Sequence, residues 1–306
     1  MKFLIRWAKK DLNLRKNVLA DVLIDKTFML IAFSCVFMLL LIMLFLFKEG
    51  LPFFADVSVW QFLFGTEWFP ASQNPRYGIA PLITASLSVT LLTAIMAVPL
   101  SLSIAIYLSE LAPSFVREIL KPAIEVIASI PSVVIGFFGM VVVAPFLQNT
   151  FNIPSGLNLF NASLMLTFMA IPTIASISED AISSVPISLK EASYALGANK
   201  WQTIFFIVLP ASLSGIWTAI ILGISRVIGE TMVVLMVAGG AAIIPDSIFS
   251  PIRPLTSNIA AEMAEADVGG MHYRALFSIA IVLFIITFVF NLLADYLSSK
   301  YKFKSN

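Results

Sequence analysis

Six long segments of the 306-residue chain are apolar and almost free of charge. A helix of about 20 apolar residues is long enough to cross the hydrocarbon core of a bilayer. Inside lipid every backbone group must be paired within the protein, and runs of this length without alternating polarity are typical of helices, not of barrel strands. The sequence therefore predicts an all-α polytopic membrane protein with six transmembrane helices. The predicted spans are 27–47, 79–108, 126–147, 157–178, 211–240 and 275–294.

Composition excludes most other classes of protein. Hydrophobic residues make up 59% of the chain and charged residues 12%, whereas a soluble domain is about 45–50% apolar and about 25% charged. A net charge of +1 argues against a nucleic-acid partner. Cys35 and His272 are the only residues of their types, so neither a disulfide nor a Cys- or His-rich metal site is expected. We expect no cofactor.

The distribution of Lys and Arg predicts the orientation of the chain. With the N-terminus inside, the cytoplasmic segments carry 14 of these residues and the external segments carry 4, which is a strong positive-inside bias. Both termini are therefore expected in the cytoplasm. The sequence divides into a cytoplasmic segment 1–26, a first helix with its external loop over 27–78, a main transmembrane unit over 79–295 and a cytoplasmic tail 296–306. The first apolar run ends without a small-residue cleavage site, so we expect an uncleaved helix and not a signal peptide.

The cytoplasmic loop between the fourth and fifth spans is predicted to form two short helices, over 186–209. Ser188 and Glu191 have the spacing of a capping box, so a helix should begin at about Ser188. Gly197 can take a left-handed conformation and end that helix. A second short helix is expected over 201–208, until Pro210 interrupts it.

The spacing of residues in this loop resembles the EAA signature of permease subunits of ABC importers. The match is Glu191-Ala192-Ser193, three residues, Gly197, nine residues, Ile207, one residue and then Leu209-Pro210. Ser193 stands where the family usually has alanine. The resemblance implies that the loop docks on a cytoplasmic ATPase through Glu191, Ala192, Gly197, Leu209 and Pro210. The chain has no Gly-x-x-x-x-Gly-Lys-Ser/Thr phosphate loop, so ATP hydrolysis is expected in a separate subunit.

Two charged residues, Arg226 and Glu230, interrupt the fifth span. Each would cost about 2.5–3.5 kcal/mol at the bilayer centre, so both should face protein or water and not lipid. Their spacing predicts one helical face, shared with the small residues Gly215, Ala219 and Gly223 and buried against other helices. Two interpretations compete. The pair neutralise each other inside the bundle, or Arg226 binds an oxyanion through its planar fork while Glu230 accepts a hydrogen bond from a protonated one.

Blocks spread over most of the chain resemble a narrower family, the PstC-type permease subunits of phosphate ABC importers. The resemblance implies a type I ABC importer permease fold and transport of inorganic phosphate, with Arg226 and Glu230 on the substrate pathway. It also implies a PstA-type second permease, two copies of a cytoplasmic ATPase and an external phosphate-binding protein. The matching blocks are 65–68, 77–83, 107–113, 130–139 and 226–232.

Other functions remain open on the sequence. A permease for another oxyanion, such as phosphonate or sulfate, would differ in competition assays. An intramembrane enzyme would need a cluster of catalytic groups, and only Arg226 and Glu230 lie clearly within the spans, so we expect no catalytic residues. An ion-driven carrier would not need the loop 186–209, and co-purification with an ATPase would distinguish it.

Overall fold

The computed structural model describes residues 2–300, and it describes side chains for residues 24–294 and Tyr296. Most of the predicted tail, residues 301–306, lies outside the described residues. The fold is helical apart from one short antiparallel pairing, in which Trp68 lies opposite Tyr77 and Phe69 opposite Arg76. The elements are α1 (Lys2–Gly50), η1 (Leu51–Ala55), α2 (Val59–Phe64), β1 (Trp68–Phe69), β2 (Arg76–Tyr77), α3 (Ala80–Ile106), η2 (Tyr107–Leu111), α4 (Ser114–Ala128), α5 (Ser132–Phe138), η3 (Gly139–Val143), α6 (Ala144–Phe151), α7 (Leu159–Ser183), α8 (Ile187–Ala195), α9 (Lys200–Thr203), η4 (Ile204–Val208), α10 (Leu209–Ile228), α11 (Met232–Val237), α12 (Leu255–Glu262) and α13 (Met271–Lys300).

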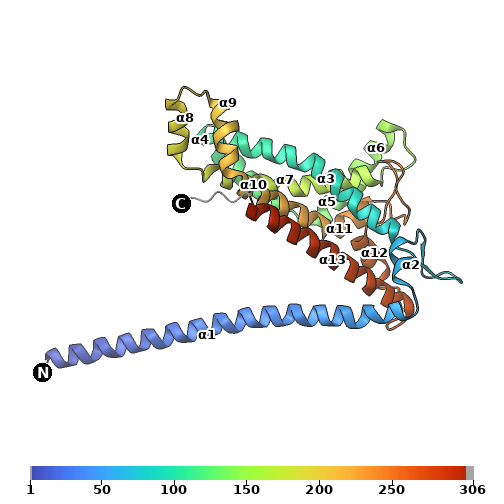
Figure 1. Cartoon of the computed structure of the whole chain (residues 1–306), viewed down its shortest axis with the longest axis horizontal. Coiled ribbons are helices and arrows are strands. Elements are labelled where there is room, and N and C mark those ends of the chain that lie inside the picture. Colours follow the sequence, from blue (N-terminus) through green and yellow to red (C-terminus); the bar gives the residue numbers. More distant parts are fainter. Residues whose placement is uncertain (1, 301–306) are drawn as a thin grey trace.

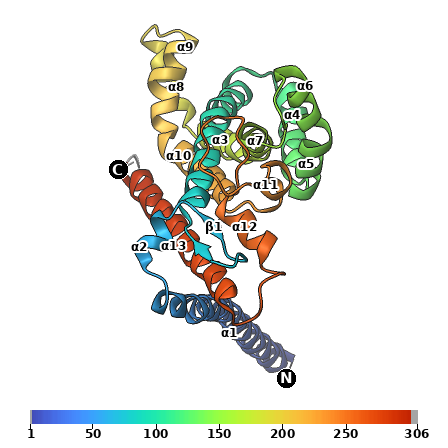
Figure 2. The same cartoon turned by 90° about the vertical axis from the view of Figure 1, so that its right-hand side faces the viewer.

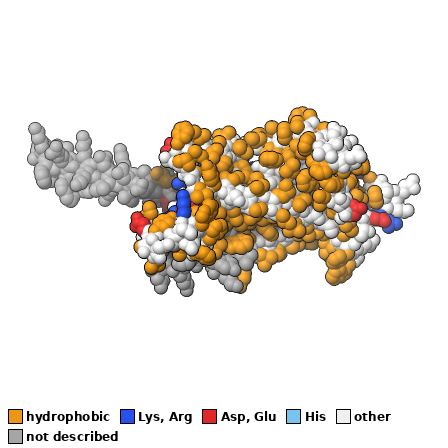
Figure 3. Space-filling view, turned by 90° about the horizontal axis from the view of Figure 1, so that it is seen from above, with side chains coloured by type: hydrophobic (Ala, Val, Ile, Leu, Met, Phe, Trp, Pro, Cys, Tyr) orange, Lys and Arg blue, Asp and Glu red, His pale blue; other side chains and the backbone are white. Residues whose placement is uncertain are grey.

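Within the described residues, six helical segments are long and apolar enough to cross a membrane, which confirms the predicted number. Figure 3 shows apolar side chains over most of the middle of one face, with charged side chains toward its ends. This surface is typical of a protein whose middle lies in lipid. The segments are Ile24–Ala55, Ala80–Leu111, Ser132–Phe151, Leu159–Ser183, Lys200–Ile228 and Met271–Ala294.

The third span begins later than the sequence predicts. Residues 126–128 belong to α4, a separate amphipathic helix, and the span starts at Ser132. The cause is Pro131, which has no N–H to donate and which disfavours helical geometry at the residue before it. The predicted span 126–147 is therefore wrong at its start, because an apolar turn looks like helix on a hydropathy scale.

α7 is the centre of the bundle. Figure 2 shows it enclosed by α3, α5, α10 and α11, and it is the most buried of the six spans. Its buried positions include Ala162, Leu166, Ala170 and Ile174, which pack with residues of α3, α10 and α11 in the main apolar core. Any displacement of α7 is therefore transmitted to three other helices, because close-packed interiors transmit strain.

The bundle has two distinct ends, which we call the α8 end and the α2 end (Figure 1). The α8 end carries α4, α8 and α9, while the α2 end carries α2, α6 and the β1–β2 pairing. At the α2 end an aromatic cluster that includes Phe53, Phe62 and Trp68 forms a second core. α1 joins the bundle there, where Ser278 Oγ donates to the Gly50 carbonyl at 2.9 Å, and its other end extends away from the bundle (Figure 1).

Candidate functional site

A break in the fifth span lies beside the two charged residues that the sequence singles out. α10 ends at Ile228 and α11 begins at Met232, so the predicted unbroken helix over 211–240 is wrong. Arg226 occupies the last turn of α10, while Glu230 lies in the break. The prediction that both side chains share one helical face fails because the helix ends between them.

Glu230 stabilises the start of α11. Its Oε1 accepts hydrogen bonds from the backbone N–H groups of Met232 at 3.1 Å and Val233 at 3.3 Å. Its carbonyl accepts one from Thr256 Oγ1 at 2.8 Å. The first N–H groups of a helix have no partner within that helix, so a carboxylate here satisfies them. Glu230 thus fixes the geometry of the break.

Arg226 is exposed at the edge of this break. Its Nη1 donates to Thr173 Oγ1 of α7 at 3.4 Å, and within the described part of the chain no carboxylate forms an ion pair with it. The predicted burial of Arg226 is therefore wrong in the single permease chain. Of the two interpretations of the pair, neutralisation of Arg226 by Glu230 is also wrong there. A guanidinium has five N–H donors, so most of its donors remain available to a ligand.

The small residues of α10 pack as predicted against a neighbouring helix. A Cβ atom on Gly223 would lie 2.3 Å from Ile174 Cγ1, and one on Gly215 would lie 2.4 Å from Ala181 Cβ. Both neighbours belong to α7. Close approach of this kind is what small residues at a four-residue period allow in membrane helices. The contact places the Arg226 turn of α10 directly beside α7.

The helical hairpin 187–208, formed by α8, α9 and η4, lies at the other candidate site (Figure 1). Gly197 has φ of +83°, as expected at the end of the first helix, and a Cβ atom there would meet nothing within 4 Å. Glycine is therefore favoured here by the backbone conformation and not by a lack of space. Glu191 and Ala192 are exposed on α8, Pro210 is exposed and Leu209 is half-buried.

Two local predictions for this hairpin are wrong. The N-cap of α8 is Pro186, and no side chain caps the helix. The capping box is instead formed by Asn199 and Gln202 at the start of α9. Pro210 does not interrupt the second helix, because η4 is a π-helical turn that runs straight into α10. Such a turn shifts the hydrogen-bond pattern just before the proline, so the absent N–H can be accommodated.

Between α8 and α9 the hairpin forms an open groove of about 580 Å³. Apolar side chains at its rim are strongly exposed, including Leu196 at 89% and Phe206 at 74%. Exposed apolar patches of this kind mark protein interfaces. The groove is lined by Leu189, Ala192, Ser193, Leu196, Gly197, Ala198, Gln202, Phe206 and Ile207.

Ser193, the departure from the EAA pattern, has a clear structural role. Its side chain is buried between the two helices, and its Oγ lies 2.9 Å from Thr203 Oγ1. Thr203 Oγ1 in turn donates to the Asn199 carbonyl at 3.1 Å. The serine therefore joins α8 to α9 by a buried hydrogen bond that alanine could not form.

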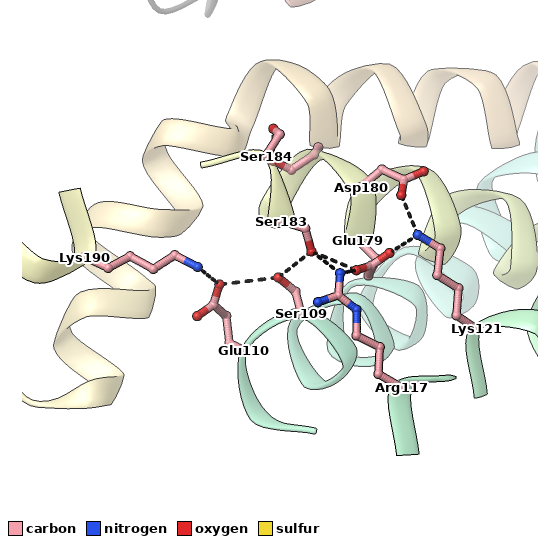
Figure 4. Close-up of polar contacts among 10 residues, drawn as sticks. Ser109, Glu110, Arg117, Lys121, Glu179, Asp180, Ser183, Ser184 and Lys190 are labelled. Carbon is pink, nitrogen blue, oxygen red and sulfur yellow. Dashed lines mark hydrogen bonds and ion pairs between the residues drawn. The ribbon is translucent and has the colours of Figure 1, made fainter. Parts of the chain in front are cut away.

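A network of charged side chains at the α8 end was not predicted from the sequence (Figure 4). Its centre is Glu179 of α7, which is fully buried and is bound by Arg117 and Lys121 of α4. Lys121 Nζ lies 2.5 Å from Glu179 Oε2 and 2.6 Å from Asp180 Oδ1. Hydrogen bonds to Asp180 and Glu179 raise the pKa of Lys121. A buried carboxylate of this kind needs such partners, because an uncompensated charge in the interior is costly.

A family model for the inner membrane component of binding-protein-dependent transport systems matches residues 97–303. The chain belongs to this family. The matched region contains both candidate sites, so the hairpin 187–208 and the break beside Arg226 are features of an ABC importer permease subunit. The resemblance of its EAA loop to such permeases is thereby confirmed.

Relatives of this permease cover most of its length. The probable ABC transporter permease protein YqgH of Bacillus subtilis (strain 168) is 40% identical over 263 residues, which is 85% of each chain. The phosphate transport system permease protein PstC of Pasteurella multocida (strain Pm70) is 37% identical over 247 residues, covering 74% of this chain and 76% of that protein. The PstC protein of Haemophilus influenzae (strain ATCC 51907 / DSM 11121 / KW20 / Rd) is 35% identical over 258 residues, covering 78% and 81%.

Solved structures show the same fold. The inward-facing MetNI methionine ABC transporter has a chain that superposes with a TM-score of 0.57 at 20% identity, covering 72% of this permease and 94% of that chain. A bacterial ABC transporter involved in the import of alginate gives a TM-score of 0.56 at 15% identity, covering 73% and 80%. The predicted type I ABC importer permease fold is thereby confirmed.

The α2 end of this permease holds one further polar cluster, centred on Glu262. Its carboxylate accepts hydrogen bonds from Trp68 Nε1 at 3.0 Å and from Arg253 Nη1 at 2.7 Å, and it lies 2.9 Å from His272 Nε2. These groups border a cavity of about 490 Å³. The cluster ties the β1–β2 pairing to α12 and α13, so its evident role is to hold the loops of this end together.

Proposed function

We propose that this permease moves inorganic phosphate across the cytoplasmic membrane by alternating access, driven by ATP hydrolysis in a partner. The observation that carries the proposal is the exposed Arg226 guanidinium at a break in a membrane span. It occurs in a chain whose relatives at 33–37% identity are named phosphate transport permeases. A guanidinium binds two oxygens of a tetrahedral oxyanion at once, with geometry and charge that suit phosphate.

The break supplies a second group for this task. One oxygen of Glu230 caps α11, while its Oε2 has no hydrogen-bond partner within the described part of the chain. This oxygen is available to accept a hydrogen bond from hydrogen phosphate, whereas sulfate at neutral pH has no proton to donate. A site that accepts such a bond discriminates against an anion that lacks the proton. Arg226 and Glu230 are therefore assigned to the substrate pathway.

The proposed partners are those implied by the resemblance to PstC-type permeases, and membership of the binding-protein-dependent transport family supports an ATPase and a binding protein among them. The importer holds two copies of a cytoplasmic ATPase, and one of them docks on the hairpin 187–208 of this chain. The coupling positions are Glu191, Ala192 and Gly197 in the hairpin, with Leu209 and Pro210 at the start of α10. A PstA-type permease completes the pore, and a phosphate-binding protein delivers substrate at the α2 end. The excess of Lys and Arg in one set of loops supports cytoplasmic termini, with 1–26 and 296–306 on the side of the hairpin.

Reconstitution of the complex into proteoliposomes tests the proposal. We expect ATP-dependent uptake of radiolabelled phosphate that sulfate and phosphonate compete poorly. Arg226→Gln should reduce uptake about 10- to 100-fold without loss of assembly, because hydrogen bonds to charged groups contribute about 1.5–3 kcal/mol. Arg226→Lys keeps the positive charge but loses the planar guanidinium, so its rate of uptake should lie between those of the wild type and Arg226→Gln.

Thr173→Val is the matched control, since it removes the protein contact of Arg226 and leaves the guanidinium intact. Its uptake should stay within about twofold of the wild type, because one long hydrogen bond contributes little. Wild-type uptake by an assembled Arg226→Gln complex would refute the site. Equal competition by sulfate would favour another oxyanion as substrate, and uptake without ATP would favour an ion-driven carrier.

A further inference from the structure

The helix α8 has one polar connection to the transmembrane bundle within the described part of the chain. Its side chains make two polar contacts with other elements, Ser193 with Thr203 of α9 and Lys190 with Glu110 of η2. Of these two contacts, only the one between Lys190 and Glu110 connects α8 to an element outside the hairpin 187–208. Lys190 Nζ lies 2.5 Å from Glu110 Oε1, and the two side chains are 19% and 8% exposed. A pair so little exposed is screened less by water and salt than a surface pair.

From Glu110 a series of polar contacts continues inward (Figure 4). Ser109 Oγ donates to Glu110 Oε1 at 3.3 Å, and Ser183 Oγ lies 3.2 Å from Ser109 Oγ. The single proton of Ser183 is needed for the bond to Ser109, so Arg117 Nη2 makes the next link. Arg117 Nη2 donates to Ser183 Oγ at 2.8 Å and also to Glu179 Oε1, which lies 2.8 Å from Ser183 Oγ. We call Lys190, Glu110, Ser109, Ser183 and Glu179 the polar relay. It joins α8, η2 and α7, and the two cations of α4 that bind Glu179 add a fourth element.

The inner end of the relay lies on the helix that contacts the proposed substrate site. Thr173, the hydrogen-bond partner of Arg226, and Glu179 both belong to α7. They are six residues apart, which is about 9 Å at 1.5 Å per residue. The same helix therefore contacts the relay at one point and the Arg226 turn of α10 at another.

We propose that Lys190 and Glu110 are positioning residues that pass displacement of α8 to α3 and α7, and that Glu179 holds α4 in the same moving unit. The inference rests on the proposed function in one respect, because it takes α8 as the element that the ATPase moves. Separation of α8 from η2 would leave the nearly buried Glu110 carboxylate without its cation, and this cost makes the elements move together.

Charge substitutions in the assembled complex, reconstituted with its ATPase, test the relay. Lys190→Met and Glu110→Gln should retain the ATPase and its basal hydrolysis. Phosphate transported per ATP should fall about fivefold, the low end of measured coupling effects. The double variant Lys190→Glu/Glu110→Lys, which swaps the two charges, should restore most of the phosphate transported per ATP. Lys200→Met is the matched control, because Lys200 is exposed on α9 of the same hairpin and should leave the ratio unchanged.

A second measurement needs no phosphate, so it separates failure of the relay from failure of the proposed substrate. Ser176 is half-buried on α7, between Thr173 and Glu179. Ser176→Cys in a Cys35→Ser background leaves a single thiol in this permease chain. Its reaction rate with a maleimide, read from labelling of this chain, is measured with and without ATP–vanadate trapping. We expect trapping to change the rate in this parent and in Lys200→Met, but not in Lys190→Met.

Each outcome decides the question. An ATP-dependent change in labelling that depends on Lys190, even without phosphate uptake, supports the relay and refutes only the substrate. Lys190→Met that behaves like Lys200→Met would overturn the relay. Loss of the ATPase from Lys190→Met alone would make Lys190 a docking contact and overturn it too, as would a parent whose labelling ignores trapping.

Discussion

The buried carboxylate of Glu179 gives a sharp quantitative test of how α4 is held on α7. Glu179→Gln keeps the shape of the side chain but removes the charge that compensates Arg117 and Lys121. Removal of one partner from a buried pair costs about 3–5 kcal/mol. The two cations are 39% and 29% exposed, so water screens part of this cost, and we estimate about 2–3 kcal/mol.

Asp180→Asn is the matched control, because it makes the same chemical change at the next residue. The Asp180 side chain is 63% exposed, and among the residues with described side chains it pairs only with Lys121. Exposed pairs contribute about 0–1 kcal/mol. The structure therefore predicts a difference of about 1–3 kcal/mol between two neighbouring carboxylates, set by burial and by the number of partners.

Hydrogen exchange of the α4 amides in nanodiscs measures the difference. If α4 exchanges by detaching from α7, Glu179→Gln should accelerate exchange over 114–128 by about 30- to 150-fold, since each 1.4 kcal/mol is a factor of ten. Asp180→Asn should accelerate it by less than about fivefold. Equal acceleration in the two variants would refute the argument from burial. Acceleration in α12 as large as that in α4 would show general destabilisation instead.

Two further predictions concern the hairpin 187–208. Gly197→Val should weaken ATPase binding, because a β-branched residue at φ of +83° costs at least about 1–2 kcal/mol. Gly197→Asn should retain binding, because asparagine tolerates this conformation. Co-purification measures both variants, and equal loss of the ATPase would mean that a side chain of any kind clashes with it. Ser193→Ala removes the hydrogen bond to Thr203 and should destabilise the hairpin by about 1 kcal/mol. Hydrogen exchange of the α8 amides should be faster in this variant than in the exposed control Ser188→Ala. An unchanged exchange rate would contradict the role assigned to Ser193.

The number of membrane spans could be predicted because length and absence of charge are sufficient to identify a spanning helix. Their ends could not, for a physical reason. The turn that contains Pro131 adds one serine to an apolar run, and the break at 229–231 adds one charge and one hydroxyl, which barely lowers a hydropathy average over about 20 residues. A hydropathy average does not distinguish such a break from a continued helix. Proline and glycine indicate where to look, but whether the chain breaks there depends on packing, as Pro210 shows by lying in a continuous helix.

Some residues of the candidate sites could likewise be predicted from the sequence, and others could not. Arg226 could be found because a charge in an apolar run is conspicuous, and the hairpin because its motif has fixed spacing. Glu179 could not, since it lies at the end of a predicted span, where a charge normally faces water. One signal was present: Arg117 and Lys121 are four residues apart, so they lie on one face of a helix and require an acidic partner if that face is buried. Only the packing of α4 against α7 identifies the partner.

The position of Pro172 in α7 bears on how far motion can travel along that helix. A proline inside a helix removes the hydrogen bond to the carbonyl four residues earlier and weakens the turn before it. In α7 the weakened turn covers 168–172, so the segment from Thr173 to Ser183 lies wholly on one side of it. The partner of Arg226 and the inner end of the polar relay therefore belong to one unbroken helical segment. Bending at 168–172 would let this segment follow α8 while the rest of α7 stays packed at the α2 end, which is the asymmetry that the proposed alternating-access mechanism requires.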